Sequence, residues 1–342
     1  MPSLVTHMAN IRYLTGFTGS AGVLASADGK FAFFTDGRYT TQAREQVRNA
    51  RVVTSRKSAL NAAAEWLSAR KLDRVAIEAD HVTVQQAAAI RRALKQAGAS
   101  AAVKGVAGEL ERLRMVKDES ELARIRAAVA LASEQFEVAL AAIRPGNTEL
   151  DVAAELEYGC RRAGAEGMAF DTLCSAGLRS AFPHGTASQN KLPKRGFVIL
   201  DYGVILAGYC SDMTRTVFIG RASAKERSMY GAVLEAHEAA KAAVKPGATA
   251  GEVDDAARKV LSRAKLEKFF THSTGHGVGL EIHEPPRIGR QQTELLRPGM
   301  VITIEPGVYV PGLGGVRIED MVLVTNSGCE TLTPTPKEFV AL

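Results

Sequence analysis

The chain has 342 residues, of which 46% are hydrophobic and 23% are charged, and its formal net charge is +6 at pH 7. This composition is typical of an ordinary globular protein, and the length is sufficient for two domains. No apolar run approaches the roughly 18 residues of a membrane-spanning helix, and no signal-peptide pattern opens the chain, so we expect no membrane partner.

The basic residues and the cysteines narrow the class further. Basic clusters near residues 91–95 and 112–117 stand beside acidic residues in helix-like segments, which indicates solvated helix faces and no nucleic-acid partner. The four cysteines are far apart and lack any CxxC pairing, as expected of reduced thiols in a cytoplasmic protein.

Residues 1–110 predict a small α/β amino-terminal domain. Asp28–Gly29 between apolar runs is a strong hairpin signal, and the strand–helix alternation favours a mixed sheet covered by helices. No chemistry is predicted here, because His7 and His81 stand alone. A domain boundary is expected near residues 107–115. The predicted strands are 4–6, 23–26, 31–35, 52–54, 74–78 and 101–106, and the predicted helices are 38–47, 60–67 and 84–97.

The rest of the chain, 111–342, contains a weak internal repeat. Residues 134–152 align with residues 235–253, and each segment is an Ala-rich helix followed by Pro–Gly and a Thr that can cap a second helix. A duplicated unit of two helices and a strand would place a cleft between two related halves. Chance similarity between two Ala-rich helices remains the alternative.

The stretch from Asp201 to Asp212 predicts a β-hairpin, because apolar and β-branched runs flank a small turn at residues 206–208. With the turn centred between Leu206 and Ala207, Asp201 lies directly opposite Asp212. Opposed side chains have Cβ atoms about 4.5–5.5 Å apart, so two carboxylates there repel unless one is protonated or a cation lies between them. The hairpin is therefore a candidate metal site, and an exposed hairpin with both carboxylates in water is the alternative.

Three further candidate ligands follow: His276, Glu305 and Glu319. Both glutamates lie in short Val- and Ile-rich segments, where a buried carboxylate is costly without a partner. Strand alternation places Thr303 and Glu305 on one face, and Arg317 and Glu319 on one face, with 310–315 as the connection. One imidazole and four carboxylates suit Mn²⁺, Co²⁺ or Zn²⁺ in a two-metal site.

These motifs resemble those of the creatinase/prolidase (pita-bread) metallopeptidases, and within that family the small bacterial Xaa-Pro aminopeptidases and Xaa-Pro dipeptidases. The resemblance covers nearly the whole chain, because residues 10–19 and 34–39 are similar to the family's amino-terminal domain. The motifs that carry the resemblance are DYG (201–203), SDMTRT (211–216), HSTGHGVGLEIHE (272–284), TIEPG (303–307) and RIED (317–320).

The resemblance implies an α+β fold, with a small α/β domain over 1–110 and a pita-bread catalytic domain over 111–342. It implies two divalent metal ions, usually Mn²⁺ or Co²⁺, in a homodimer. Because few residues precede Asn10, the amino-terminal domain is expected to lack its first helix. The ligands that it implies are Asp201, Asp212, His276, Glu305 and Glu319.

The resemblance also implies catalytic roles. Metal ions lower the pKa of bound water, and Glu305 is then the expected general base. His184 and His283 are expected to stabilise the oxyanion or to pass a proton, and His272 is expected near the substrate. Arg317 either orients Glu319, contacts substrate or forms a plain salt bridge.

The preferred function is an Xaa-Pro aminopeptidase that acts on peptides with proline in the second position. An Xaa-Pro dipeptidase is the alternative. A non-peptidase hydrolase and a non-catalytic binding protein on the same scaffold remain further possibilities, against which the intact ligand set argues.

Overall fold

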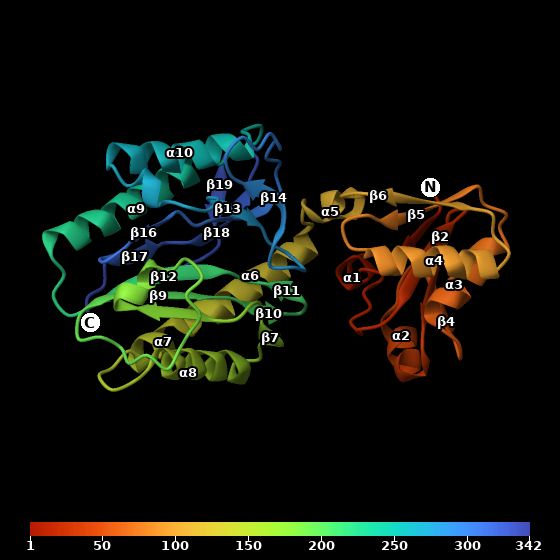
Figure 1. Cartoon of the computed structure of the whole chain (residues 1–342), viewed down its shortest axis with the longest axis horizontal. Coiled ribbons are helices and arrows are strands. Elements are labelled where there is room, and N and C mark those ends of the chain that lie inside the picture. The colour runs from red at the N-terminus through yellow and green to blue at the C-terminus, as the bar shows by residue number, and fades with distance from the viewer. The chain divides into compact units, whose positions relative to one another are not determined.

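The structure is a computed structural model, and it describes residues Met1–Leu342. The chain divides into two compact units, Met1–Arg114 and Met115–Leu342 (Figure 1). No helix combines the length and the apolar character that crossing a membrane requires. The four cysteines form no disulfide.

The first unit is built on a six-stranded mixed sheet of order β4-β3-β2-β1-β5-β6. The β2–β3 hairpin turns at Asp28–Gly29, as the sequence predicts, and β1 pairs in parallel with β5. The strands are β1 (Ser3–Val5), β2 (Val23–Ala27), β3 (Lys30–Thr35), β4 (Arg51–Thr54), β5 (Arg74–Glu78) and β6 (Ala102–Val106).

The helices of this unit are α1 (Met8–Thr15), the 3₁₀ turn η1 (Gly37–Tyr39), α2 (Thr40–Gln46), α3 (Ala59–Ser68), α4 (Val84–Gln96) and α5 (Glu109–Arg114). Helix α1 is absent from the sequence prediction. It buries Ile11 and ends at Gly16, whose φ of 79° closes the helix with a left-handed residue.

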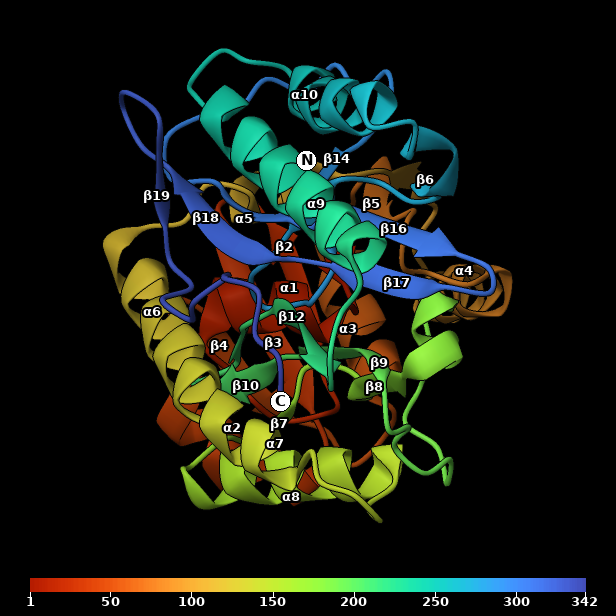
Figure 2. The same cartoon turned by 90° about the vertical axis from the view of Figure 1, so that its left-hand side faces the viewer.

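The second unit places its strands between two layers of helices. Figures 1 and 2 show α9 and α10 on one side of the strands and α7 and α8 on the opposite side. The helices are α6 (Glu119–Glu134), α7 (Phe136–Ala142), α8 (Glu149–Arg162), α9 (Ala224–Ala243) and α10 (Ala250–Arg263), with 3₁₀ turns η2 (Gly177–Ala181) and η3 (Glu267–Phe269).

The strands of this unit form several small sheets, of which β12-β9-β8 and β14-β13-β15-β18-β19 matter most for the site. Their bounds are β7 (Gly167–Met168), β8 (Leu173–Ala176), β9 (Gly196–Tyr202), β10 (Val204–Leu206), β11 (Tyr209–Cys210), β12 (Met213–Ile219), β13 (Gly275–Gly277), β14 (Glu284–Ile288), β15 (Val301–Ile304), β16 (Gly307–Val310), β17 (Gly314–Arg317), β18 (Asp320–Val324) and β19 (Cys329–Thr331).

The internal repeat is a structural duplication. Helices α8 and α10 have the same length, and both bounds differ by 101 residues, the offset of the sequence repeat. Each begins with a Thr capping box, at Thr148 and at Thr249. The predicted α+β architecture with a duplicated helix–strand unit is therefore confirmed, and the matching helix bounds argue against chance similarity of the two segments.

The register predicted for the aspartate hairpin is wrong by two residues. The turn is Ala207–Gly208, one residue later than expected, and both residues have positive φ, 48° and 82°, which suits a two-residue hairpin turn. Asp201 consequently pairs with Thr214, and Asp212 lies just before β12. A two-residue shift keeps both aspartates on one face, because the side-chain period of a strand is two.

The strand pairing predicted around Glu305 and Glu319 also needs correction. The expectation was two strands joined by residues 310–315. Instead β15 pairs with β18, and the hairpin of β16 and β17 is inserted between them. The last pair of the β15–β18 ladder is Ile304 with Asp320, so both glutamates lie at the same open end of that ladder.

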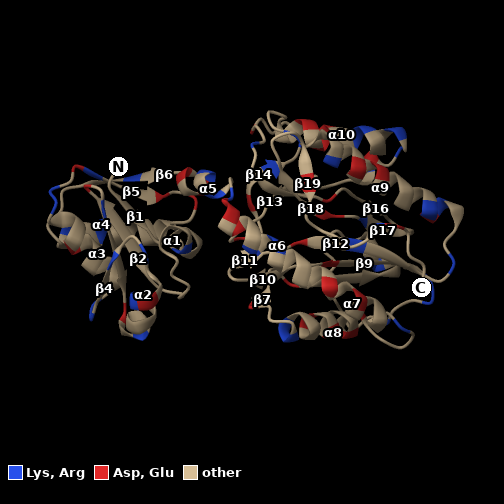
Figure 3. Cartoon of the chain, turned by 180° about the vertical axis from the view of Figure 1, so that it is seen from behind, with Lys and Arg blue, Asp and Glu red and all other residues tan.

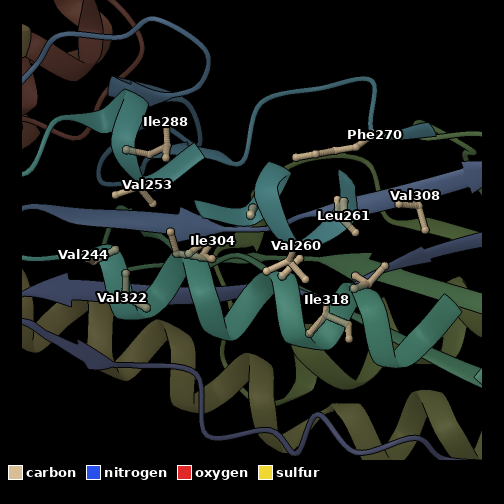
Figure 4. Close-up of a cluster of buried hydrophobic side chains, with 14 of the residues drawn as sticks. Val244, Val253, Val260, Leu261, Phe270, Ile288, Ile304, Val308, Ile318 and Val322 are labelled. Carbon is tan, nitrogen blue, oxygen red and sulfur yellow. The ribbon is translucent and has the colours of Figure 1, made fainter. Parts of the chain in front are cut away.

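The largest hydrophobic core lies between helices α9 and α10 and the strands β15 to β18 (Figure 4). Leu261, on α10, is fully buried there, beside Val260 and Phe270. A second core packs α6, α7 and α8 against β8, β9 and β12. The carboxylate-bearing strand ends are thus fixed from both sides.

We expect Leu261→Ala to lower the free energy of unfolding by about 2–5 kcal/mol, because it removes buried methyl groups and leaves a cavity. Leu150→Ala, on the equivalent helix α8, is the control, since Leu150 is 39% exposed. Urea unfolding followed by far-UV circular dichroism measures both. A loss at Leu150 as large as that at Leu261 would contradict the assignment of the core.

Candidate metal centre

Two open strand ends bring four carboxylates together. Asp201 is the penultimate residue of β9 and Asp212 immediately precedes β12, while Glu305 immediately follows β15 and Glu319 precedes β18. Each half of the duplication thus supplies one carboxylate where a strand arrives and one where its partner strand leaves. Figure 3 shows acidic residues on the strands between the helix layers, whereas the outer helices carry both charges.

These side chains line a cavity of about 800 Å³ that lies entirely within the second unit. All nine predicted site residues contribute to its wall. They are His184, Asp201, Asp212, His272, His276, His283, Glu305, Arg317 and Glu319.

Asp212, His276 and Glu319 form the tightest group, because one potential ligand atom from each lies within 4.8 Å of the other two. His276 Nε2 lies 3.6 Å from Asp212 Oδ2 and 3.4 Å from Glu305 Oε1. Asp201 joins the cluster by a different route, through an ion pair with Arg317.

The hydrogen bonds of His276 decide which of its nitrogens could bind a metal. Nδ1 lies 3.0 Å from the Gly277 carbonyl, which can only accept, so Nδ1 carries the proton. Burial lowers the pKa of His276, which favours the neutral ring. The unprotonated Nε2 then faces the carboxylates as a ligand atom.

The buried carboxylates repel one another, and their burial and this repulsion both raise the pKa values of three of them. Burial, and then the charges of Glu319 and Asp201, raise the pKa of Asp212 well above its usual range. Burial and the charges of Glu305 and Asp201 do the same for Glu319, and burial raises the pKa of Glu305 to about 7.

Two buried oxygens in the cluster also lack a hydrogen-bond partner, Oδ1 of Asp201 and Oδ1 of Asp212. Buried carboxylate oxygens without a donor are costly. Divalent cations remove both the repulsion and the missing contacts. The donor set, one imidazole with carboxylate oxygens, therefore fits the predicted metal pair.

Arg317 forms an ion pair with Asp201 and makes no direct ion pair with Glu319. The guanidinium pairs with Asp201, and its Nε donates to Thr214 Oγ1 at 3.1 Å. Thr214 Oγ1 in turn donates to Glu319 Oε2 at 2.7 Å, so Arg317 reaches Glu319 only through that hydroxyl. Arg317 is 4% exposed. It contacts Asp201 directly and is linked to Glu319 through the Thr214 hydroxyl.

His272 belongs to a hydrogen-bond chain that starts at Arg317. Arg317 Nη1 donates to Tyr309 Oη at 2.6 Å, and Tyr309 Oη lies 2.9 Å from His272 Nε2. His272 Nδ1 donates to the Ser273 carbonyl, so Nε2 must accept from Tyr309. Burial and the Arg317 charge lower the pKa of His272 to about 3, which leaves a neutral ring with both nitrogens engaged.

His184 and His283 are placed differently, since both are exposed at the cavity wall. The ring of His283 stands edge-on to that of His276, with centroids 4.4 Å apart. Burial lowers the pKa of His283. Both imidazoles can therefore meet a molecule in the cavity.

Several residues at the site escaped the sequence prediction. Thr214 would have been found with the correct hairpin register, because it is the true partner of Asp201. Tyr309 and Arg287 carry no local signal. Arg287 lines the cavity, and its Nε donates to Ser273 Oγ at 2.9 Å.

Comparison with known proteins follows the same division of the chain. Residues 3–116 match the creatinase/prolidase N-terminal domain, and residues 123–326 match metallopeptidase family M24. The chain belongs to metallopeptidase family M24. It is a metallo-exopeptidase of the pita-bread fold.

An uncharacterized peptidase of Bacillus subtilis, YqhT, is 38% identical over 339 residues, which cover 99% of this chain and 95% of that protein. The Xaa-Pro dipeptidase from Bacillus anthracis is similar in structure, with a TM-score of 0.95 and 38% identity over 100% of this chain and 95% of that chain. The X-Pro aminopeptidase from Thermotoga maritima has a TM-score of 0.91 at 34% identity, over 100% of this chain and 98% of that chain.

We expect Asp212→Asn to stabilise the metal-free M24 unit and to abolish its stabilisation by metal. Without metal, the neutral amide relieves the repulsion among the buried carboxylates. With metal, the same substitution removes a ligand. Melting temperatures measured with chelator and with excess Mn²⁺ separate the two effects. Asp255→Asn, an exposed position on α10, is the control and should change neither value. A full Mn²⁺-dependent shift in Asp212→Asn would contradict the assigned ligand.

Proposed function

We propose that this chain is an Xaa-Pro aminopeptidase, which releases the amino-terminal residue from peptides with proline in the second position. The observation that carries the proposal is the buried carboxylate cluster, with two unpartnered oxygens, on the wall of a cavity of about 800 Å³. We propose that two divalent ions, Mn²⁺ or alternatively Co²⁺ or Zn²⁺, are held by Asp201, Asp212, His276, Glu305 and Glu319.

When bound, such ions polarise the peptide carbonyl and lower the pKa of the attacking water. Glu305 is the general base: its carboxylate lies on the cavity wall, with Oε1 3.4 Å from His276 Nε2, where it can accept a proton from the attacking water and return it. His184 and His283 reach the cavity and donate to the oxyanion. Arg317 keeps Asp201 in place, and His272, whose nitrogens are both engaged, orients Arg317 through Tyr309.

The site is compatible with proline in the second position of the substrate, because it does not require a backbone N–H from that residue. The bond before proline is a tertiary amide, without the N–H that peptidases usually bind. A site that acts on the carbonyl through metal and imidazole has no use for that donor. The cavity, about 800 Å³ in volume, can admit peptides longer than a dipeptide as well as dipeptides.

An Xaa-Pro dipeptidase is the second candidate, and Arg287 is the observation that favours it. Its guanidinium lies on the cavity wall, exposed, whereas that of Arg317 is buried and bound to Asp201. A free cation there can pair with the carboxyl terminus of a dipeptide. The Bacillus anthracis structure, which carries the dipeptidase name, agrees with this alternative.

We further propose that the enzyme is a cytoplasmic homodimer, and that residues 1–110 and 111–342 are its two domains.

Substrate length tests the choice. With Mn²⁺ or Co²⁺ added, we expect Xaa-Pro-Xaa tripeptides to be hydrolysed at least as fast as Xaa-Pro dipeptides, because a cavity of about 800 Å³ is large enough for a tripeptide. Release of the first residue is measured by chromatography. Turnover of dipeptides alone would establish the dipeptidase, and turnover of neither would refute the peptidase proposal.

Arg287→Gln refines that experiment. If the enzyme is a dipeptidase, this substitution should lower kcat/KM on Xaa-Pro dipeptides by about tenfold or more. The carboxyl terminus of the dipeptide would lose a charged hydrogen-bond partner worth about 1.5–3 kcal/mol. An aminopeptidase loses little on a tripeptide amide, which has no such charge. Equal losses on both substrates would remove Arg287 from carboxylate recognition.

His283→Ala should lower kcat by about 10²–10³ while the metal content stays near that of the unmodified enzyme. His276→Ala, only seven residues away, should lose both activity and bound metal. Metal analysis of the dialysed proteins beside steady-state kinetics distinguishes the two roles. Metal loss in His283→Ala as severe as that in His276→Ala would make His283 a ligand.

A further inference from the structure

The segment between β8 and β9 carries His184 to the cavity, and both of its limbs are tied to one carboxylate, Glu149. On the outgoing limb, the Ala176 N–H donates to Glu149 Oε1 at 2.8 Å, and Arg179 Nε donates to Oε2 at 3.0 Å. On the return limb, Ser188 Oγ donates to Oε2 at 2.6 Å. The base of the segment is therefore closed by a single side chain.

Arg179 extends this closure across the segment. Its Nη2 donates to the Thr186 carbonyl at 2.9 Å, so one guanidinium joins the carboxylate to the return limb. Glu149 itself is 1% exposed. A carboxylate so buried is costly unless it is fully hydrogen-bonded, and here three donors and a positive charge satisfy it.

The duplication shows what this carboxylate is not needed for. Ala250 begins α10 where Glu149 begins α8. The backbone contact is nevertheless the same in both halves, since Glu149 N donates to the Asn190 carbonyl at 3.0 Å and Ala250 N to the Glu294 carbonyl at 2.9 Å. The helix start and the returning segment therefore pair without a carboxylate side chain.

The next residues repeat the comparison. Leu150 N donates to the Ser188 carbonyl at 3.0 Å, and Gly251 N to the Gln292 carbonyl at 2.9 Å. Because the second half achieves this pairing with Ala250, the Glu149 side chain is an addition specific to the half that carries His184.

A second attachment lies at the tip of the segment. The Pro183 carbonyl accepts from Arg317 Nη1 at 2.9 Å, and His184 follows directly, exposed at the cavity. Phe182, on the other side of Pro183, is 54% exposed, and the Arg179 guanidinium lies over its ring, 5.7 Å from the centroid. The place of His184 is thus fixed by two attachments, the base at Glu149 and the Pro183 carbonyl.

We propose that Glu149, with Arg179, is a positioning residue that holds His184 in register with the metal cluster. The inference rests on the proposed function of His184. It assigns the first turn of α8 a role in the reaction beyond its role in the fold.

A double-mutant cycle tests this. Glu149→Gln should lower kcat on an Xaa-Pro peptide by about tenfold to a hundredfold, with a smaller change in KM, because misplacement by about 1 Å can cost that much. In a His184→Ala background the same substitution should lower kcat no further. Equal losses in both backgrounds would overturn the proposal, because a purely structural effect does not depend on His184.

The matched control is Asp151→Asn, two residues along the same helix. Asp151 caps α8 by accepting from Thr148 N at 2.7 Å and from Thr148 Oγ1 at 2.8 Å, whereas Glu149 accepts from the segment that carries His184. Asp151→Asn should lower the melting temperature and leave kcat unchanged. If it lowers kcat as Glu149→Gln does, loss of helix stability explains both, and the proposal is wrong.

Arg179→Gln provides a second route if Glu149→Gln does not fold, since the Arg179 side chain is 29% exposed. It should reproduce the dependence on His184. Hydrogen exchange in the metal-free protein should be faster over residues 177–188 in either variant. Unchanged protection there would contradict the proposal that Glu149 and Arg179 hold this segment in place. This readout needs no turnover, so it distinguishes failure of that proposal from failure of the proposed peptidase activity.

Discussion

Mutual repulsion among buried carboxylates is the constraint on which the second unit depends. Four acidic side chains converge at one end of two strand pairs, and burial together with the charges of neighbouring carboxylates raises the pKa of three of them. The neighbouring residues offset only part of this cost. Arg317 neutralises Asp201, and the Thr214 hydroxyl donates to Glu319, but two carboxylate oxygens keep no partner. The remaining imbalance is what makes the cluster suited to cations.

The duplication explains how the chain gathers these charges. Two helix–strand units of the same design present their strand ends to each other, and the helix layers fix those ends from outside. The halves are not equal in chemistry. Only the second supplies an imidazole to the tight group, His276, and only the first carries a carboxylate at the start of its short helix, Glu149.

The sequence predicts the site better than it predicts the backbone that builds it. All nine predicted site residues line one cavity wall, and eight of them lie in the five motifs that carry the family resemblance, His184 being the exception. The predicted hairpin register was wrong because the turn was placed one residue too early. The predicted turn, Leu206–Ala207, and the observed turn, Ala207–Gly208, differ only in which two residues adopt positive φ. The face survived the error because strand periodicity is two.

Other features could not be predicted, because they depend on contacts between distant segments. Nothing near Arg317 distinguishes Asp201 from Glu319 as its partner, and Tyr309 gains its role from His272, 37 residues away. Helix α1 was missed because it lacks a start signal: its N-cap residue, His7, makes no side-chain capping hydrogen bond, and no acidic residue lies in its first turn.

The split origin of the cluster also orders events during synthesis of the chain. The ribosome completes the aspartate hairpin of β9 and β12 about a hundred residues before the second pair of carboxylates exists, because Asp212 and Glu319 are 107 positions apart. Until Glu319 emerges, the nascent hairpin has two acidic groups and no second half to share a cation with. An ion held by ligands from both halves could therefore bind with its full set of carboxylates only after Glu305 and Glu319 have been synthesised.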